Sequence, residues 1–206
     1  MATVLAGTAL LNDITLVRTS STPMAIFRAA VRRIGLHIAA ETTKYLPGRD
    51  VTISTPLEST TATVIDGHVV LVPVLRAGLG LLDAFLDILP DASVGYVGLK
   101  RNEETLEPQA YYQNLPPIDA TTTVIILDPM LATGGSMKAA LSVITPLQPK
   151  KILAASLIAA PEGVSAVESA YPGVSIVVGT VDRCLNDHGY IVPGLGDAGD
   201  RLFGTT

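Results

Sequence analysis

Five short apolar runs constrain the fold of this chain more than any other feature of its sequence. They are rich in Val, Ile and Leu and cover Val69–Leu75, Val94–Leu99, Thr123–Leu127, Ile152–Ala159 and Val174–Val181. Segments with apolar residues at helical spacing follow several of them, at Leu79–Leu89, Ser136–Leu147 and Glu162–Ala170. Strands joined through single helices form right-handed crossovers and a parallel sheet covered on both faces. The sequence therefore predicts an α/β fold with a central, mostly parallel, five-stranded sheet flanked by helices.

The rest of the chain contains one long helical pattern and several irregular segments. Apolar residues recur at helical spacing from Ser21 to Tyr45, and residues 51–56 and 61–65 predict two extended segments joined by a turn. Residues 101–117 are polar and too long for a simple connection, which predicts a protruding β-hairpin arm or lid. Residues 186–206 are rich in Gly and show no periodic element, which predicts a shaped C-terminal hood loop. Ligands of open α/β sheets bind outside the carboxyl ends of the strands, so the chemistry is expected just after each strand.

The segment Val124–Ser136 carries the strongest chemical signal. A buried strand delivers Asp128 at its carboxyl end, and a short loop then leads through Thr133-Gly134-Gly135 into a helix. Glycines let backbone N–H groups approach an anion, hydroxyls add donors, and the helix presents its positive end. A bare Thr-Gly-Gly is often only a helix start. The complete order of strand, Asp128, loop and helix instead favours a phosphate site, with the Asp128 carboxylate beside it to bind a sugar diol. The segment predicts a ribose 5-phosphate site, and the absence of Lys before Ser136 excludes a triphosphate loop.

Arg76 occupies a similar place after the strand Val69–Leu75. The backbone amides of Ala77 and Gly78 follow it, and together these groups predict a second anion site. Arg binds phosphoryl oxygens in a bidentate fork, so the site suits pyrophosphate. Taken alone, an Arg after a strand is more often a surface residue, but its pairing with the first loop favours the anion site. Arg101, after the next strand, adds a third charge at the same edge.

The C-terminal segment Tyr190–Asp200 is the third chemical signal. Its dense glycines expose consecutive backbone amides and carbonyls. The recognition edge of uracil offers a carbonyl, an N–H and a carbonyl, and a backbone that presents amide, carbonyl and amide matches it. Cytosine would place its amino group against an amide donor, a mismatch that costs several kcal/mol where water is excluded. Read in isolation, the same glycines are also typical of turns that only close loops.

Together these motifs resemble the uracil phosphoribosyltransferases, which have the type I phosphoribosyltransferase fold. The resemblance extends from about Pro73 to Thr206. It is carried by Leu75–Gly78, Arg101–Leu106, Asp128–Ser136, Ala160–Gly163 and Tyr190–Gly204. The N-terminal region departs from the family pattern, because it reads Leu10-Leu-Asn-Asp13 where relatives usually have His and basic residues.

The resemblance implies transfer of a 5-phosphoribosyl group from phosphoribosyl pyrophosphate (PRPP) to uracil, giving UMP and pyrophosphate, with Mg²⁺ as cofactor. The implied catalytic residues are Arg76, Arg101, Asp128 and Asp197. The implied PRPP-binding residues are Arg76, Arg101, Asp128, Pro129, Met130, Leu131, Ala132, Thr133, Gly134, Gly135, Ser136 and Asp197. The implied uracil-binding residues are Ile191, Gly196, Asp197 and Ala198. Pro129 stands where wider type I members carry a second acid, which shifts the implied Mg²⁺ contact, through water and PRPP, to Asp197.

Composition and charge limit the kinds of partner and the location expected for this chain. A net charge of −5 argues against nucleic-acid binding. Charges and a Pro interrupt the apolar stretch Val69–Leu89, so no membrane span is expected, and the single Cys184 excludes an internal disulfide and favours a cytoplasmic location. With 48% hydrophobic residues, we expect a homodimer or a higher homo-oligomer. The resemblance adds GTP as an effector. We expect one domain, divided into an N-terminal helix region (1–66), a PRPP-binding core (67–182) and a base-binding hood (183–206).

Three alternatives stay open at this point. The enzyme could accept another base, such as cytosine or a purine. The chain could be a regulator that keeps the fold and binds RNA, although its net charge of −5 argues against this. It could also be a sensor that binds PRPP or a nucleotide without turnover, although the presence of Asp128, Arg76, Arg101 and Asp197 favours an enzyme.

Overall fold

A computed structural model describes residues 1–101 and 108–205, and the side chains of residues 100–110 lie outside that description. The main sheet of the described chain has nine strands, with the order β1-β11-β10-β8-β4-β6-β7 and two short additions, β5 beside β4 and β9 beside β10. The strands are β1 (Thr3–Val4), β4 (His68–Leu75), β5 (Ser93–Val94), β6 (Tyr96–Arg101), β7 (Pro108–Asn114), β8 (Thr122–Leu127), β9 (Met130–Leu131), β10 (Lys151–Ala159) and β11 (Ser175–Val181). The pairing of β7 with β6 is antiparallel and the other pairings of this sheet are parallel.

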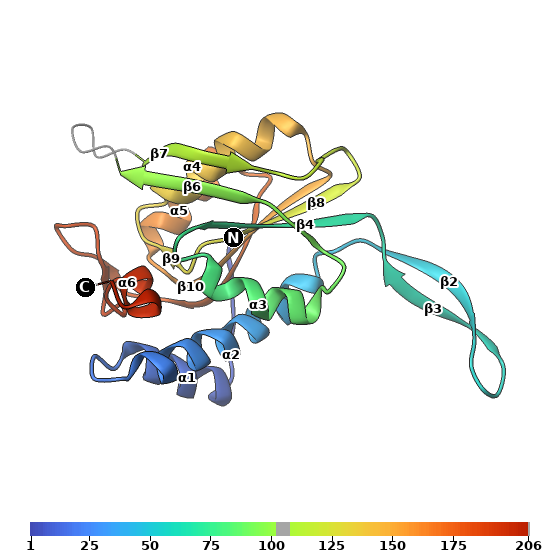
Figure 1. The fold of residues 1–206 in the computed structure, drawn as a ribbon, viewed down its shortest axis with the longest axis horizontal. Coiled ribbons are helices and arrows are strands. Elements are labelled where there is room, and N and C mark those ends of the chain that lie inside the picture. The colour runs from blue at the N-terminus through green and yellow to red at the C-terminus, as the bar shows by residue number, and fades with distance from the viewer. Residues whose placement is uncertain (102–107, 206) are drawn as a thin grey trace.

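Helices cover both faces of this sheet (Figure 1). Those on one side are α1 (Thr8–Arg18), α2 (Met24–Thr43) and α3 (Leu79–Ile88). Those on the other are α4 (Gly135–Ile144), followed by the short η1 (Thr145–Leu147), and α5 (Pro161–Ala170). Along β4, Val69 and Leu71 join the hydrophobic cluster under α1–α3, whereas Val70, Val72 and Val74 join the cluster under α4 and α5. Successive side chains of a strand point to opposite faces, so burial of both faces explains why the strand reads as a continuous apolar run.

The predicted α/β fold is confirmed, and the sheet is wider than the five predicted strands. All five predicted strands are present, and β1 and β7 extend the sheet at its two edges. The predicted turn between two extended segments is the antiparallel hairpin of β2 (Gly48–Ser54) and β3 (Ser59–Ile65). The hairpin predicted within 101–117 is formed by β6 and β7, and its tip, residues 102–107, lies outside the described residues.

Two helices were not predicted from the sequence. In α1, Leu10, Ile14 and Val17 are buried at helical spacing, but the apolar face also carries the buried Asp13, which pairs with Arg33 of α2 and interrupts the hydrophobic pattern. The expectation that residues 186–206 contain no periodic element was wrong, because α6 (Ala198–Phe203) forms there. Its six residues are fewer than two helical turns and too few to show a period.

No helix among residues 1–101 and 108–205 combines the length and the apolar character needed to cross a bilayer.

Candidate active site

A cavity of about 340 Å³ lies at the carboxyl ends of the central strands, between the loop after β8 and the C-terminal segment. The loop and the start of α4 contribute Asp128, Met130, Ala132 and Ser136, and Ala77 follows β4. The C-terminal segment contributes His188, Gly189, Tyr190, Ile191, Gly196, Asp197, Ala198 and Gly199. The structure therefore brings Asp128 and Asp197, which are far apart in sequence, into one cleft.

Asp128 is a buried carboxylate at the end of β8. Its backbone N–H donates to the carbonyl of Ala155 on β10 at 3.1 Å, which fixes the residue at the carboxyl-terminal end of the central strands. Its Oδ1 accepts a hydrogen bond from the backbone N–H of Met130 at 3.3 Å. Burial raises the pKa of Asp128 to about 6, and the Met130 N–H only partly offsets this effect. The carboxylate therefore titrates close to neutral pH.

The loop after Asp128 is shaped by two glycines that tolerate no larger residue without strain or a clash. Gly134 precedes α4 with a φ of 78°, in the left-handed region that favours glycine. A Cβ on Gly163, in the first turn of α5, would lie 2.2 Å from the carbonyl oxygen of Ala132. Gly134 has no side chain to cap α4, and the N–H of Gly135 makes only a long hydrogen bond to Thr133 Oγ1, at 3.3 Å, so the amides that begin α4 can still donate to an anion. This geometry suits a monophosphate.

Arg76 lies after β4, beside the same edge of the sheet. A Cβ on Gly78 would lie 2.4 Å from the carbonyl oxygen of Leu127, so this loop packs directly on the end of β8. The half-exposed Arg76 guanidinium donates to Asp200 Oδ1 and to Thr205 Oγ1, both at 3.4 Å. It thus contacts the C-terminal segment and does not line the cavity. The side chain of Arg101 lies outside the described residues.

The C-terminal segment forms a hood over the cavity. It consists of residues 183–205, with a two-stranded ribbon of β12 (Cys184–Leu185) and β13 (Ile191–Val192) followed by α6. Ile191 and Ala198 are buried, and Gly196 has a φ of 82°. Asp197 caps α6 by accepting the N–H of Asp200 at 2.9 Å, which holds its side chain in a fixed place.

The remaining residues of the predicted PRPP set support the loop without lining the cavity. The carbonyl of Pro129 accepts N–H groups of Leu157 and Ile158, each at 3.0 Å, and the carbonyl of Leu131 accepts that of Ala160 at 2.9 Å. Their backbones are therefore held by β10 and the segment that follows it. Thr133, Gly134 and Gly135 form the turn into α4, where Thr133 Oγ1 accepts the N–H of Gly135 at 3.3 Å.

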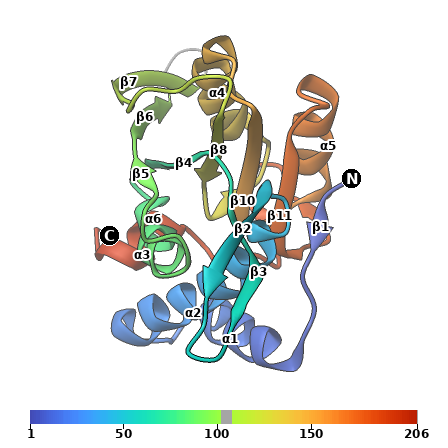
Figure 2. The ribbon, with the colours of Figure 1, turned by 90° about the vertical axis from the view of Figure 1, so that its right-hand side faces the viewer.

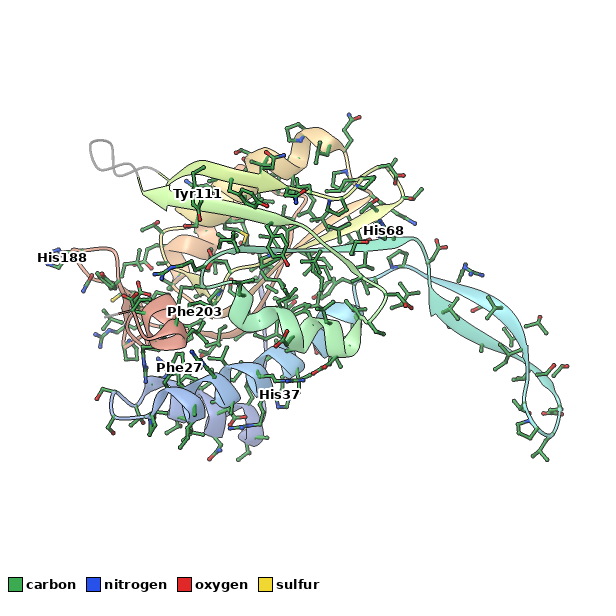
Figure 3. The ribbon with its side chains drawn as sticks, in the orientation of Figure 1. Phe27, His37, His68, Tyr111, His188 and Phe203 are labelled. Atoms are coloured by element: carbon green, nitrogen blue, oxygen red, sulfur yellow. The ribbon has the colours of Figure 1, made fainter. Side chains whose placement is uncertain are left out.

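Sequence reasoning missed the arginine that holds the hood in place. Arg201 of α6 donates to the carbonyl oxygens of Leu195 and Thr19, both at 2.7 Å, and to that of Val17. Its guanidinium lies 4.2 Å from the centroid of the Phe27 ring, and burial lowers its pKa. Figure 3 shows Phe27 on α2 next to α6, while His188 lies at the outer end of the hood. The contacts of Arg201 with Val17, Thr19 and Phe27 span about 180 positions, so no local pattern signals them.

The carboxylates of the cavity fit a Mg²⁺ ion that is carried largely by a substrate. Among the residues that the structure describes, no group of three or more His, Cys, Asp or Glu side chains is placed to hold a metal. Proteins usually bind Mg²⁺ through one or two carboxylates, with substrate phosphates and water completing the coordination. Asp128 and Asp197, which line the same cavity, fit this pattern.

The fold is that of the type I phosphoribosyltransferases. A purine phosphoribosyltransferase from Pyrococcus horikoshii superposes with a TM-score of 0.51 at 19% sequence identity, over 73% of this chain and 85% of that chain. A solved protein structure from Aquifex aeolicus is much more similar, with a TM-score of 0.93 and 39% identity over 100% of this chain and 99% of that chain.

The sequence comparisons define the family. The family model described as uracil phosphoribosyltransferase matches residues 4–205. A uracil phosphoribosyltransferase of Acidovorax sp. (strain JS42) is 47% identical over 195 residues, which are 94% of this chain and 93% of the relative. One from Clostridium perfringens is 46% identical over 197 residues, 95% of this chain and 94% of the relative. The chain belongs to the uracil phosphoribosyltransferase family.

Proposed function

We propose that this protein transfers the 5-phosphoribosyl group of PRPP to uracil, giving UMP and pyrophosphate. The observation that supports this most directly is the single cleft shared by the loop after β8 and the hood, with Asp128 on one side and Asp197 on the other. A phosphate site and a backbone-lined base site must lie next to each other for this reaction. Full-length similarity to relatives that carry the name of this activity supports the same proposal.

The loop from Asp128 to Ser136 is proposed to hold the ribose 5-phosphate. The phosphate would accept hydrogen bonds from the first amides of α4 and from the hydroxyls of Thr133 and Ser136. The ionised Asp128 would accept hydrogen bonds from the ribose diol, and charged acceptors strengthen such bonds. Tight packing of Gly163 against Ala132 keeps these groups in register.

Pyrophosphate is proposed to leave toward Arg76 and Arg101. The exposed contact of Arg76 with Asp200 is long, at 3.4 Å, and an exposed ion pair of this kind contributes little. A pyrophosphate group with several negative charges can therefore displace Asp200 and take the guanidinium fork. When bound with PRPP beside Asp197, Mg²⁺ supplies positive charge for the leaving group.

Ile191, Gly196, Asp197 and Ala198 are proposed to bind uracil. Ile191, Gly196 and Ala198 would present backbone groups to its carbonyl and N–H edge, which cytosine cannot match. As pyrophosphate departs, positive charge develops on the ribose ring, the uracil N1 forms its bond to C1, and the N1 proton passes to the departing pyrophosphate or to water. Preorganised charges such as the Asp128 carboxylate stabilise this transition state without forming a covalent bond to the sugar. The chain would thus position both reactants in one cavity.

The test is turnover by the purified protein. With PRPP, Mg²⁺ and labelled uracil, we expect stoichiometric UMP and pyrophosphate, and we expect cytosine and hypoxanthine to react far more slowly. Chelation of Mg²⁺ with EDTA should stop the reaction, and excess Mg²⁺ should restore it. Formation of a nucleotide from another base would correct the base assignment. PRPP binding without turnover of any base would favour a sensor over an enzyme.

We also infer that the protein assembles into a homodimer or a larger homo-oligomer. The β2–β3 hairpin projects from the body of the molecule as a free arm (Figures 1 and 2). All but one residue of each strand are exposed, including Ile53, Val64 and Ile65, and Leu57 lies at the tip. An isolated two-stranded hairpin is only marginally stable in water, so a second subunit is the expected support of this arm.

Charging the apolar side chains of the arm is expected to dissociate the oligomer. In Ile53→Asp/Val64→Asp, two carboxylates would be buried at the subunit contact, which is costly without partners. Sedimentation velocity at micromolar concentration should change from an oligomer to a monomer. Thr52→Asp, next to Ile53 on the opposite face of β2, should leave the assembly intact. A monomeric unsubstituted protein would contradict the inference.

We also propose a role for each of the three regions of the chain. Residues 1–66 support the hood and the subunit contact, residues 67–182 bind PRPP, and residues 183–206 bind the base. GTP as an effector and a cytoplasmic location stay predictions.

A further inference from the structure

A partly buried ion pair links the end of α1 to the base of the hood. Asp182 follows β11 directly and its side chain is 2% exposed, while Arg18 is the last residue of α1. Arg18 Nη1 donates to Asp182 Oδ2 at 2.8 Å, and Nη2 donates to Oδ1. The planar guanidinium thus binds both carboxylate oxygens. A buried ion pair of this kind is weak evidence for stability alone, because desolvation offsets most of its attraction.

The two charged partners also bind the backbone of one residue of the hood, Gly194. The N–H of Gly194 donates to Asp182 Oδ2 at 2.8 Å, and its carbonyl accepts from Arg18 Nη1 at 3.1 Å. Gly194 has a φ of 62°, and a Cβ there would lie 2.2 Å from the carbonyl oxygen of Ile191. The turn is therefore tight, and the ion pair holds its N–H and its carbonyl at the same time.

This turn lies between the residues proposed to bind uracil. Ile191 precedes it by three positions, and Gly196 and Ala198 follow it closely. Hydrogen bonds from a backbone edge to a base weaken steeply when the donor angle falls below about 120°. A backbone without side-chain donors cannot adjust by rotamer changes, so its position must be set from outside.

We propose that Arg18 and Asp182 are positioning residues for base recognition, which hold the Gly194 turn so that the hood backbone matches uracil. The proposal rests on the proposed function. Neither side chain lines the cavity, so both act through the turn. The phosphate loop is held by other contacts, from β10 and α5, so loss of this pair should leave that loop in place.

A second ion pair in the same helix provides a matched control. Asp13 of α1 is buried and accepts from Arg33 at 3.0 and 2.6 Å, again through a guanidinium fork. This pair joins α1 to α2 and has no recorded contact with the hood within the described residues. Its loss affects stability in a similar way and leaves the Gly194 turn in place.

The test compares Asp182→Asn with Asp13→Asn in steady-state kinetics with uracil and PRPP. In Asp182→Asn we expect the KM for uracil to rise about 10-fold or more with kcat nearly unchanged, because the hood backbone binds the base equally well in the ground state and in the transition state. The ratio of kcat/KM for uracil to that for cytosine should fall. The Kd for PRPP alone, measured by calorimetry, should change less than about 2-fold. In Asp13→Asn both the uracil KM and the PRPP Kd should stay within about 2-fold.

Arg18→Lys gives the same test should Asp182→Asn fail to fold. Lys keeps the charge but not the fork, so it can replace only part of the three hydrogen bonds that Arg18 donates and should give an intermediate uracil KM. An unchanged uracil KM in both variants would overturn the inference, and so would an equal loss of uracil and PRPP affinity. In either case the proposed function stands as long as the unsubstituted protein makes UMP. Absence of UMP from the unsubstituted protein would remove the proposed function and this inference with it.

Discussion

Replacing Asp128 by Asn is expected to lower kcat/KM for uracil by about 10²- to 10⁴-fold, because two hydrogen bonds from the ribose diol to a charged acceptor are worth about 3–6 kcal/mol together. Asn has nearly the same shape and can still accept the N–H of Met130, so the loop should keep its conformation. In the unsubstituted protein, kcat/KM should fall as the pH drops through about 6, where Asp128 becomes protonated. The Asn variant should lack this step.

The same substitution should make the folded protein more stable at neutral pH. The pKa of Asp128 is raised from 3.8 to about 6 by burial, so the folded state resists ionisation and the unfolded state does not. The stability is therefore highest below pH 4 and falls as the pH rises through 6. Each pKa unit corresponds to about 1.4 kcal/mol, so Asn should increase the free energy of unfolding at pH 7.5 by up to about 3 kcal/mol.

Asp119, at the other end of β8, is the matched control. The Thr121 hydroxyl and the backbone N–H of Thr121 donate to it at 2.7 and 2.8 Å, and these bonds lower its pKa. Its contribution to stability is present above the unfolded pKa and is lost as the pH falls, the opposite sign to Asp128. Asp119→Asn should therefore destabilise the protein at pH 7.5 and leave turnover unchanged.

Urea unfolding at pH 4 and 7.5, combined with turnover, separates these outcomes. A loss of stability at pH 7.5 in Asp128→Asn would show that favourable contacts hold the carboxylate. It would contradict the expectation that the buried carboxylate destabilises the folded protein. Turnover within a few-fold of the unsubstituted protein would remove Asp128 from the catalytic set.

The loop from Asp128 to Ser136, which the structure places at the cavity, could be singled out from the sequence because its signal is local. The strand, Asp128, the glycine turn and the next helix follow each other within 13 residues, and each has its own composition. The sheet was predicted for the same reason, since burial on both faces leaves continuous apolar runs in each strand. The edge strand β1 was missed because it has only two residues, whereas β7 was expected as part of a hairpin arm and not as the other edge of the sheet.

The support of the hood could not be predicted in this way. Arg18 and Asp182 are 164 positions apart, and Arg76 and Asp200 are 124 apart, so each pair is defined only by the folded chain. Asp13 interrupts the apolar face of α1, so the helix cannot be recognised from the sequence until its partner on α2, Arg33, is known. Base recognition by backbone groups leaves only glycines as a signal, and glycines also mark ordinary turns.

The packing of α5 against the phosphate loop leads to the second large effect, in Gly163→Ala. Ala in place of Gly within a helix normally stabilises a protein by about 0.5–1 kcal/mol. Here the new Cβ would lie 2.2 Å from the carbonyl oxygen of Ala132 and 2.7 Å from that of Leu131. Both atoms belong to the backbone, so the loop must move, and overpacking of this kind costs about 1–3 kcal/mol. The clash outweighs the gain in helix propensity, and the free energy of unfolding should fall.

The larger consequence of Gly163→Ala is expected in catalysis. A shift of Leu131 and Ala132 would move the amides proposed to hold the 5-phosphate, and a displacement of about 1 Å can reduce the rate about 10²-fold. The kcat/KM for PRPP should fall by about that factor. Gly173→Ala, just after the same helix, is the control, because a Cβ there has no neighbour within 4 Å, so activity and stability should be unchanged. Full activity in Gly163→Ala would mean that the loop takes its catalytic shape only when PRPP binds, and that α5 does not set it beforehand.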